Sequence, residues 1–281
     1  MIKSNVVNDR YDRLAEGIPP CGGVCLRGSM EGQKRMLSFV RRCVDDFSLI
    51  DDGDRIAVGV SGGKDSLTLC VTLAALRRFY PKKFSLGAIA VDMCFGDLGS
   101  GDGTDYSSIG TLCGEIGVPF TVVPSQIAKI IFDVRKEKNP CSLCSVMRKG
   151  ALNDAAKTMG YNKVALGHNF DDLVETAMMN LLIQGHFDAF EPSAYLSRTG
   201  LTVIRPLLYA PEKDVRYFAS KAGLPVMRSS CPANGNTERE YVKQLINDQN
   251  RRYDGVSHRI FLALKKSGWG SADGMPGIES E

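Results

Sequence analysis

The 281-residue sequence has neither a strong net charge nor a long apolar run. Its 35 lysine and arginine residues stand against 32 aspartate and glutamate residues, which leaves a formal charge of only +3. Total charge therefore gives no sign of a polyanionic partner, and any nucleic-acid surface has to come from local clusters. No stretch approaches the ~18 apolar residues that a membrane span needs, and the opening MIKSNVVNDRYDRL does not have the pattern of a signal peptide. We expect a cytoplasmic protein that does not bind a membrane.

Cysteine, in contrast, is plentiful, with nine residues in the chain. A reducing compartment disfavours structural disulfides, so clustered cysteines indicate metal or sulfur chemistry. Four cysteines stand singly in apolar surroundings and are predicted to fill the core: Cys43, Cys70, Cys94 and Cys113. The other five form two close pairs and one isolated residue: Cys21 with Cys25, Cys141 with Cys144, and Cys231.

The strongest local signal is Ser-Gly-Gly-Lys-Asp-Ser at 61–66. The preceding run Ala57–Val60 is typical of a strand buried on both faces, and apolar residues recur at helical spacing after Lys64. Two adjacent glycines allow a close backbone approach to a ligand, and the start of the following helix is an anion site. Lys64 adds a positive charge, while Ser61 and Ser66 add hydroxyl donors. The stretch predicts a phosphate or pyrophosphate site, although the spacing of a Walker A loop is absent.

The rest of the chain alternates between strand and helix patterns, which predicts an α/β fold with a doubly wound, mostly parallel sheet of five strands. The predicted strands are 55–60, 84–91, 119–123, 163–167 and 202–205, and the helices between them are 64–79, 104–117, 145–160, 170–184 and 212–222. An amphipathic helix at 31–48 and a basic helical segment at 237–266 flank this core. The predicted divisions are an irregular lead-in at 1–30, an α/β domain at 31–225, a cysteine loop with basic helices at 226–266, and a disordered tail at 267–281.

Ligands of such sheets bind beyond the carboxyl ends of the strands. That rule selects Asp92, which could bind a nucleotide or cap its own loop, and the pair Gly167 and His168. Asp171 and Asp172 follow; they either balance a helix dipole or hold Mg²⁺ together with phosphate oxygens. The glycine-rich stretch from Phe95 to Asp105 predicts a mobile lid.

The C-x-x-C spacing of Cys141 and Cys144 brings two thiolates within reach of one metal ion. Cys231 is the remote candidate for a further ligand. On spacing alone, a redox pair and a zinc knuckle remain open. The pair Cys21 and Cys25 is either a metal or redox pair or two ordinary thiols in a loosely ordered segment.

Ser-Gly-Gly-Lys-Asp-Ser directly after a buried strand resembles the PP-loop ATP pyrophosphatases, which share the adenine nucleotide alpha hydrolase fold. Members of that superfamily cleave ATP between the α and β phosphates and activate a carbonyl oxygen as an adenylate. Further motifs then occur in order: PCSLCSVMRKGAL from Pro140, VALGHNFDD from Val164, IRPL from Ile204, Glu212-Lys-Asp, and Cys231. This order resembles the tRNA 2-thiocytidine synthetase family over about residues 31–266. In that family the C-x-x-C pair and a third cysteine hold a [4Fe–4S] cluster, with one iron open to an extra sulfide.

The resemblance implies ATP-dependent tRNA thiolation, in which a pyrimidine carbonyl, expected to be that of cytidine, is adenylated and its oxygen replaced by sulfur. It implies ATP, Mg²⁺ and a [4Fe–4S] cluster as cofactors, a sulfur donor such as a cysteine desulfurase, and a homodimer as a family-level expectation. The residues implied for ATP binding are Ser61, Gly62, Gly63, Lys64, Asp65, Ser66, Asp92, Gly167 and His168. Those implied for Mg²⁺ are Asp65, Asp171 and Asp172; for the cluster, Cys141, Cys144 and Cys231; and for catalysis, Lys64, Asp65 and Asp171.

Two other functions fit the same residues. One is an adenylating ligase of the lysidine-synthetase type with a structural zinc, and the other is a non-catalytic adenine-nucleotide sensor. The basic residues of 237–266 form either a solvated helix face or a tRNA-backbone surface. They are Arg239, Lys243, Arg251, Arg252, Arg259, Lys265 and Lys266. One departure from the family pattern is Asn169, which follows His168 where a second histidine is common.

Overall fold

The chain folds around one sheet of six strands. The computed structural model describes residues 30–94, 104–135, 140–227 and 238–270. The strands follow the order β3-β2-β1-β4-β6-β5, and every neighbouring pair is parallel except β5 with β6. They are β1 (Asp54–Gly59), β2 (Phe84–Asp92), β3 (Phe120–Pro124), β4 (Lys163–Ala165), β5 (Ser193–Leu196) and β6 (Leu201–Ile204).

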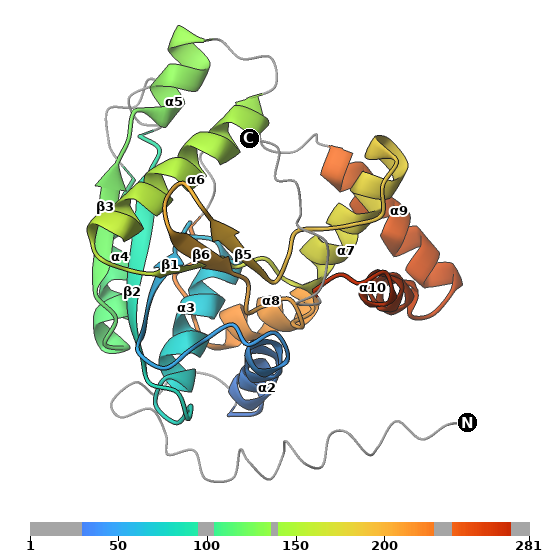
Figure 1. The fold of residues 1–281 in the computed structure, drawn as a ribbon, viewed down its shortest axis with the longest axis horizontal. Helices are drawn as coiled ribbons and strands as arrows, with labels where there is room; N and C mark the ends of the chain where they lie inside the picture. Colours follow the sequence, from blue (N-terminus) through green and yellow to red (C-terminus); the bar gives the residue numbers. More distant parts are fainter. Residues whose placement is uncertain (1–29, 95–103, 136–139, 228–237, 271–281) are drawn as a thin grey trace.

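Helices cover both faces of this sheet (Figure 1). The helices of the described residues are α2 (Met30–Asp46), α3 (Lys64–Leu76), α4 (Ser107–Glu115), α5 (Ile127–Lys129), η2 (Ile130–Val134), α6 (Pro140–Thr158), α7 (Phe170–Met179), η3 (Asn180–Gln184), α8 (Glu212–Lys221), α9 (Glu238–Arg252) and α10 (Val256–Lys266). Of these, α9 and α10 pack against α7. Along β1, Ile56 and Val58 pack in the core cluster that contains α3, whereas Ala57 packs with α6. Alternate side chains of a strand point to opposite faces, so β1 is buried between two helical layers. The predicted doubly wound α/β class is confirmed.

The strand order places β1 between β2 and β4. The chain runs from β1 to β2 on one side, and β4 lies on the other, so the carboxyl ends of β1 and β4 meet at a topological switch point. The 61–66 stretch follows β1 and the 167–172 stretch follows β4. The fold therefore brings the two predicted phosphate-side motifs to one edge of the sheet.

The sheet has one strand more than the five predicted. β5 pairs antiparallel with β6, with Ser193 opposite Ile204 and Leu196 opposite Leu201. The strand has only four residues, and they alternate between exposed and half-buried. Such a short edge strand depends on its pairing partner more than on its own residue pattern, which is why its sequence did not reveal it.

One helical prediction needs correction. Helix α6 begins at Pro140 instead of 145, so Cys141 and Cys144 lie within its first two turns and not before it. Proline is well tolerated there, because the N–H groups of a first turn have no intrahelical partner. The basic segment 237–266 forms two helices, in agreement with the predicted basic helices, because Gly255 adopts a left-handed conformation with φ of 76° between α9 and α10.

The predicted disordered tail begins too early, because Trp269 is part of the core with only 6% of its surface exposed. Its ring packs edge-on against Phe47 and Phe261, and its indole N–H donates a hydrogen bond to the Phe190 carbonyl at 3.2 Å. The predictions for 1–29, 95–103, 228–237 and 271–281 fall outside the described residues. They include Cys21, Cys25, Cys231 and most of the predicted lid.

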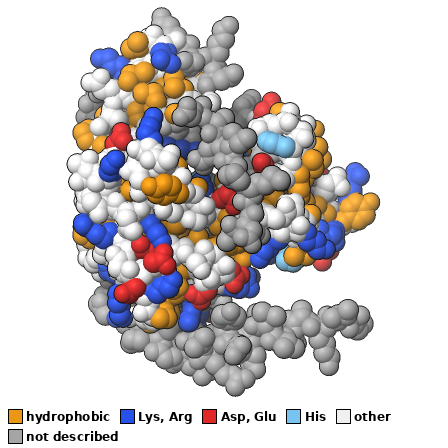
Figure 2. All heavy atoms as spheres, viewed as in Figure 1, with side chains coloured by type: hydrophobic (Ala, Val, Ile, Leu, Met, Phe, Trp, Pro, Cys, Tyr) orange, Lys and Arg blue, Asp and Glu red, His pale blue; other side chains and the backbone are white. Residues whose placement is uncertain are grey.

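Charged residues of both signs are distributed over the face seen in Figure 2, without a single broad basic field. This distribution agrees with the small net charge of the chain. Within the described ranges, none of the helices is both long enough and apolar enough to span a membrane.

Candidate active site

The phosphate loop, residues 61–66, connects β1 to α3. Gly63 is the N-cap of α3 in an extended conformation, and no side chain caps this helix end. The Ser66 hydroxyl accepts a hydrogen bond from the Ser61 N–H at 3.1 Å and donates one to the Gly63 carbonyl at 3.0 Å, which fixes the turn. The first N–H groups of a helix have no intrahelical partner and carry the positive end of its dipole. The loop thus presents an uncapped helix start that suits a phosphate group.

Two glycines are required for the loop to take this shape. Gly62 has a φ of +79°, and a Cβ at this position would lie 2.9 Å from the sulfur of Met227. Gly167 follows β4, and a Cβ there would lie 3.0 Å from the backbone of Asp65 and Ser66. The missing side chains therefore let the Met227 segment and the end of β4 reach the phosphate loop.

A cavity of about 490 Å³ opens beside the loop. Its lining includes Ser61, Gly63 and Asp65 from the loop, Gly167 and His168 after β4, and Cys144 and Arg148 from α6. Ile89, Val91 and Met93 of β2 and its end add an apolar wall. The volume lies within the range of small-molecule sites. The phosphate loop and the helix that carries the cysteine pair therefore face the same space.

His168 lines this cavity as a neutral imidazole. Burial, followed by the positive charges of Arg205 and Lys149, lowers the pKa of His168 to about 3. The ring lies against Phe190, with centroids 4.7 Å apart. Its buried Nδ1 has no hydrogen-bond partner among the residues that the structure describes. His168 can thus offer a polar nitrogen to a ligand without carrying a charge.

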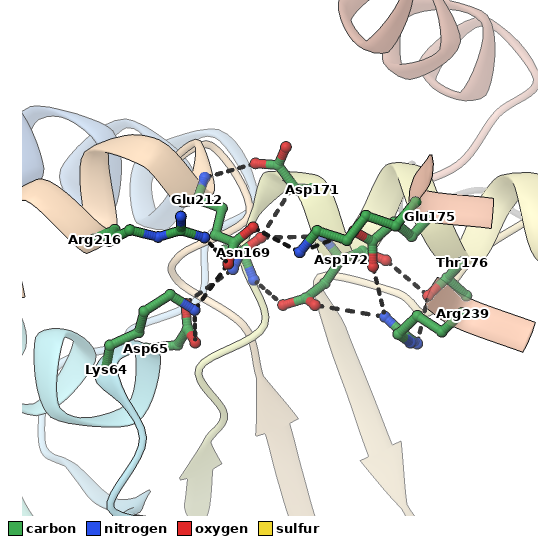
Figure 3. A network of polar contacts seen from close by, with 11 residues as sticks. Lys64, Asp65, Asn169, Asp171, Asp172, Glu175, Thr176, Glu212, Arg216 and Arg239 are labelled. Carbon is green, nitrogen blue, oxygen red and sulfur yellow. Dashed lines mark hydrogen bonds and ion pairs between the residues drawn. The ribbon is translucent and has the colours of Figure 1, made fainter. Parts of the chain in front are cut away.

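Lys64 lies between two carboxylates (Figure 3). Its Nζ is 2.9 Å from Asp65 Oδ2 and 3.1 Å from Glu212 Oε1. Burial would lower the pKa of Lys64, but the hydrogen bonds and charges of Asp65 and Glu212 outweigh it, and the pKa is raised. The ammonium group therefore stays protonated next to the uncapped start of α3.

Glu212, the first residue of α8, is shared by three cations. Besides Lys64, it pairs with Arg216 at 3.0 Å and with Lys243 of α9 at 2.9 Å. Burial would raise the pKa of Glu212, but the hydrogen bonds from Lys243 and Lys64 outweigh it and lower the pKa to about 2. The sequence motif contains Glu212, but it could not reveal this role because Lys64 and Lys243 are distant in sequence.

Asn169 is a site residue that the sequence interpretation missed. Its Oδ1 accepts hydrogen bonds from the N–H groups of Asp171 at 2.9 Å and Asp172 at 3.1 Å, and Asp172 accepts one from the Asn169 N–H at 3.0 Å. Its Nδ2 donates to Asp65 Oδ1 at 2.9 Å. The Asn-x-x-Asp spacing of this capping box was readable in the sequence. The contact with Asp65 was not, because it joins two strand ends.

Asp171 and Asp172 have protein partners. The Glu212 N–H donates to Asp171 Oδ2 at 2.6 Å, and Asp172 Oδ1 pairs with Arg239 at 3.5 Å. Burial is the main reason that the pKa of each carboxyl group is raised. Both groups therefore contribute to the polar network that surrounds Lys64, whatever else they bind.

Asp92, at the end of β2, has the loop-capping role that was one of its two predicted alternatives. Its carboxylate accepts a hydrogen bond from the Cys94 N–H at 3.0 Å, and its carbonyl accepts one from the Ser125 hydroxyl at 2.6 Å. Its two neighbours in sequence, Val91 and Met93, line the cavity instead. A contact between Asp92 and a nucleotide stays a prediction.

The cysteine pair lies within the first two turns of α6. Cys141 is exposed and Cys144 is half-buried, and their spacing of three residues places them on one helix face. A helix start stabilises thiolates, which are the form that binds metal. Within the described residues, no group of three or more His, Cys, Asp or Glu side chains could hold a metal ion, so the pair needs a ligand from elsewhere. Of the four cysteines predicted to fill the core, Cys43, Cys70 and Cys113 are buried, whereas Cys94 is only half-buried.

Comparison with known proteins identifies the family. A family model described as a PP-loop domain matches residues 32–250. The tRNA-cytidine(32) 2-sulfurtransferase of Vibrio vulnificus (strain YJ016) is 34% identical over 235 residues, which are 83% of this chain and 74% of that protein. The protein of the same name from Pelobacter propionicus is 35% identical over 234 residues, 82% of this chain and 85% of that protein. The chain belongs to the PP-loop family of tRNA-cytidine(32) 2-sulfurtransferases.

A solved structure shares the fold of this PP-loop protein. It is the U34-tRNA thiolase NcsA from Methanococcus maripaludis with its [4Fe-4S] cluster, with a TM-score of 0.64 and 24% identity. The alignment covers 84% of this chain and 79% of that one. The family match at 32–250 contains the phosphate loop, α6, Glu212 and Lys243, so the whole polar network lies within the PP-loop domain.

Proposed function

We propose that this PP-loop protein is an ATP-dependent tRNA thiolase that adenylates the carbonyl of a cytidine base and replaces its oxygen with sulfur. The observation that carries the proposal is the single cavity that the phosphate loop shares with Cys144. An adenylated base reacts with water unless the sulfur nucleophile is close by, so activation and sulfur delivery need one enclosed space. The names of the curated relatives support the choice of substrate.

The phosphate loop performs the activating half of the reaction. Residues 61–66 bind the β and γ phosphates of ATP with the uncapped N–H groups of α3 and the serine hydroxyls. The carbonyl oxygen of the base attacks the α phosphorus, and pyrophosphate leaves with the bond electrons. Lys64 stabilises the charge that develops on the leaving group, because its ammonium is already held beside the loop. Gly167 and His168 complete the nucleotide side of the cavity.

Asp65 is the proposed Mg²⁺ ligand of the loop. The predicted further ligands, Asp171 and Asp172, do not form a three-residue metal site with it among the described residues, and their carboxylates contact the Glu212 N–H and Arg239 instead. Mg²⁺ binds through one or two carboxylates together with phosphate oxygens and water. Asp65 fits this role because it lines the cavity and is fixed by the Asn169 amide. The cation would add positive charge where ATP brings its phosphates.

Cys141, Cys144 and Cys231 are the proposed ligands of a [4Fe–4S] cluster. The two described cysteines suit this role, since they lie on one helix face and Cys144 lines the cavity. Cys231 follows Met227 by four residues, and Met227 contacts Gly62, so the chain length keeps Cys231 within about 14 Å of Met227. When bound, the cluster would supply the sulfur that bonds to the activated carbon of the base, and the carbon–oxygen bond would break with release of AMP.

The proposed partners are a tRNA and a sulfur donor such as a cysteine desulfurase. The target base has to be unstacked before it can enter the cavity, so a loop nucleotide or an extruded base is required. Arg239 and Lys243 are engaged in ion pairs with α7 and α8. Contact with the tRNA backbone is therefore assigned to the outer basic residues of α9 and α10, Arg252, Arg259 and Lys266.

The decisive test is an anaerobic purification followed by iron, sulfide and zinc analysis and an absorption spectrum. The proposed thiolase function predicts about four iron atoms and four labile sulfide ions per chain and a brown protein. It also predicts pyrophosphate release from ATP in the presence of tRNA. Cys141→Ser, Cys144→Ser and Cys231→Ser should each lose the cluster but retain ATP binding. Cys43→Ser, at a buried cysteine that hydrogen-bonds a backbone carbonyl, is the matched control and should keep it.

Two outcomes would contradict the proposal. A colourless protein with stoichiometric zinc would favour the adenylating ligase. No AMP or pyrophosphate from ATP with any tRNA pool would favour the nucleotide sensor.

A further inference from the structure

Glu212 connects the lysine of the phosphate loop to helix α9. One carboxylate oxygen lies 3.1 Å from Lys64 Nζ and the other lies 2.9 Å from Lys243 Nζ. The side chains of Lys64, Glu212 and Lys243 are 26%, 16% and 34% exposed. These charges are thus partly shielded from solvent, so their interactions are screened less than those of fully exposed pairs.

The groups around Lys64 are themselves fixed. The Glu212 N–H donates to Asp171 at 2.6 Å, and Arg216, one turn along α8, pairs with the Glu212 carboxylate. On the other side, Asn169 holds Asp65. A lysine stem is flexible, so an ammonium placed between two fixed carboxylates is oriented before ATP arrives.

Helix α9 is attached to the same network at two points. Arg239 pairs with Asp172 and Glu175 of α7 at 3.5 and 3.4 Å, and Lys243 pairs with Glu212 of α8. Arg239 and Lys243 are four residues apart and therefore share one face of α9. Helix α9 and Lys64 thus contact neighbouring carboxylates of one network, which Figure 3 draws.

The network also lies between two cavities. Asp65 lines the 490 Å³ cavity of the candidate active site. Glu212 and Lys243 line a second cavity, of about 1110 Å³, between α2, α7, α8, α9 and α10. A change in the position of α9 on that side would alter the partners of Glu212, and through them the position of Lys64.

We propose that Glu212 is a positioning residue for Lys64 during ATP cleavage and that it transmits the docking of α9 to the phosphate loop. This inference rests on the proposed thiolase function. Without the Glu212 carboxylate, Asp65 is the one ion-pair partner that Lys64 keeps among the described residues, and Lys243 loses its shorter ion pair. The N–H groups of the loop are unaffected, so ATP still binds while its cleavage slows.

The test compares Glu212→Gln with the unaltered full-length protein. Glu212→Gln should lower kcat for tRNA-dependent pyrophosphate release at least tenfold and change the Kd for α,β-methylene-ATP less than threefold. Lys243→Met should lower kcat three- to tenfold, and Lys243→Arg should restore most of the loss. Lys213→Met on α8 is the matched control, and it should keep kcat within twofold. A purely structural role would instead weaken analogue binding and thermal stability together.

A double-mutant cycle tests the coupling to α9. Glu212→Gln combined with Lys243→Met should be no slower than Glu212→Gln alone, because the two residues act through one interaction. Multiplicative effects of the two substitutions would overturn the link to α9. A kcat of Glu212→Gln within twofold of the unaltered protein would overturn the positioning role.

A readout without turnover separates this inference from the proposed function. The lysines are labelled by reductive ¹³C-methylation, and the Lys64 signal is assigned from its absence in Lys64→Met. Glu212→Gln should shift and narrow the Lys64 signal, because the ammonium group then has lost one of the two carboxylates that hold it in place. An unchanged Lys64 signal would contradict the inference even in a protein that releases no pyrophosphate. The absence of pyrophosphate release by the unaltered protein would contradict only the thiolase function.

Discussion

Met227 packs against Gly62 of the phosphate loop. Its N–H donates a hydrogen bond to the Gly62 carbonyl at 2.9 Å, and its side chain lies where a Cβ on residue 62 would have to fit. The loop is thus held by Met227, which is far from Gly62 in sequence. Met227 is the last described residue before the segment 228–237, which contains Cys231. Replacement of Gly62 should disturb both the conformation of the loop and this contact.

Gly62→Ala should cost about 1–2 kcal/mol in free energy of unfolding through its positive φ, and it should weaken ATP binding at least tenfold through the clash with Met227. Gly223→Ala is the matched control. Gly223 also has a positive φ, of +62°, but no atom lies within 4 Å of its would-be Cβ. It should lose a similar stability and bind ATP normally. Equal ATP affinities of the two variants, measured by calorimetry, would show that the clash with Met227 does not affect ATP binding.

Gly167→Ala should weaken ATP binding for a different reason. A Cβ at residue 167 would press on the backbone of Asp65 and Ser66 at 3.0 Å, and backbone cannot move aside as a flexible side chain can. We expect at least a tenfold rise in the Kd for ATP. Gly114→Ala on α4, which meets no atom within 4 Å, should bind ATP like the unaltered protein. Normal ATP affinity of Gly167→Ala would mean that the contact between residue 167 and the phosphate loop does not control ATP binding.

Asn169 has two roles that substitutions can separate. Asn169→Asp keeps an acceptor for the cap of α7 but places a like charge against Asp65, so ATP cleavage should fall while the free energy of unfolding changes by less than about 1 kcal/mol. Asn169→Ala loses both contacts and should also lose about 1 kcal/mol of stability. Urea unfolding and pyrophosphate release measure the two effects. Full activity of Asn169→Asp would exclude a role for the Asp65 contact.

Glu175 predicts a pH dependence of stability. Burial raises the pKa of Glu175 from 4.5 to about 7, although Lys243 and Arg239 act in the opposite direction. At pH values between 4.5 and 7, the Glu175 carboxyl group is protonated in the folded protein and ionised in the unfolded chain. The free energy of unfolding therefore falls as pH rises. Ionisation of Glu175 should lower the free energy of unfolding by roughly 3 kcal/mol between pH 4.5 and pH 8. Glu175→Gln should have the same free energy of unfolding as the unaltered protein at pH 4.5 and a higher one at pH 8. The same difference between the two proteins at both pH values, measured by urea unfolding, would contradict this.

The sequence allowed the phosphate loop to be predicted because all of its signals are local. A buried strand, two glycines and the start of a helix follow one another within residues 57–66. The alternation of strands and helices likewise predicted the sheet, since a parallel strand buried on both faces carries a continuous apolar run. Strand β5 was missed because a short edge strand carries too weak a pattern.

The arrangement around the loop could not be predicted, because its contacts join residues that are distant in sequence. Glu212 is linked to Lys64, and Asn169 to Asp65, only once the strand order is known. Charge patterns were ambiguous for the same reason. Arg239 and Lys243 belong to a basic helix, but the carboxylates that they meet come from α7 and α8.

The position of Trp269 has a practical consequence. It is the only tryptophan in the sequence, and it is buried between Phe47 and Phe261 beyond the end of α10. Its emission spectrum is therefore an intrinsic optical reporter for release of the C-terminal helical segment from the body of the protein. Because the indole lies outside both cavities, a red shift on adding tRNA would record a rearrangement of that segment without an attached dye.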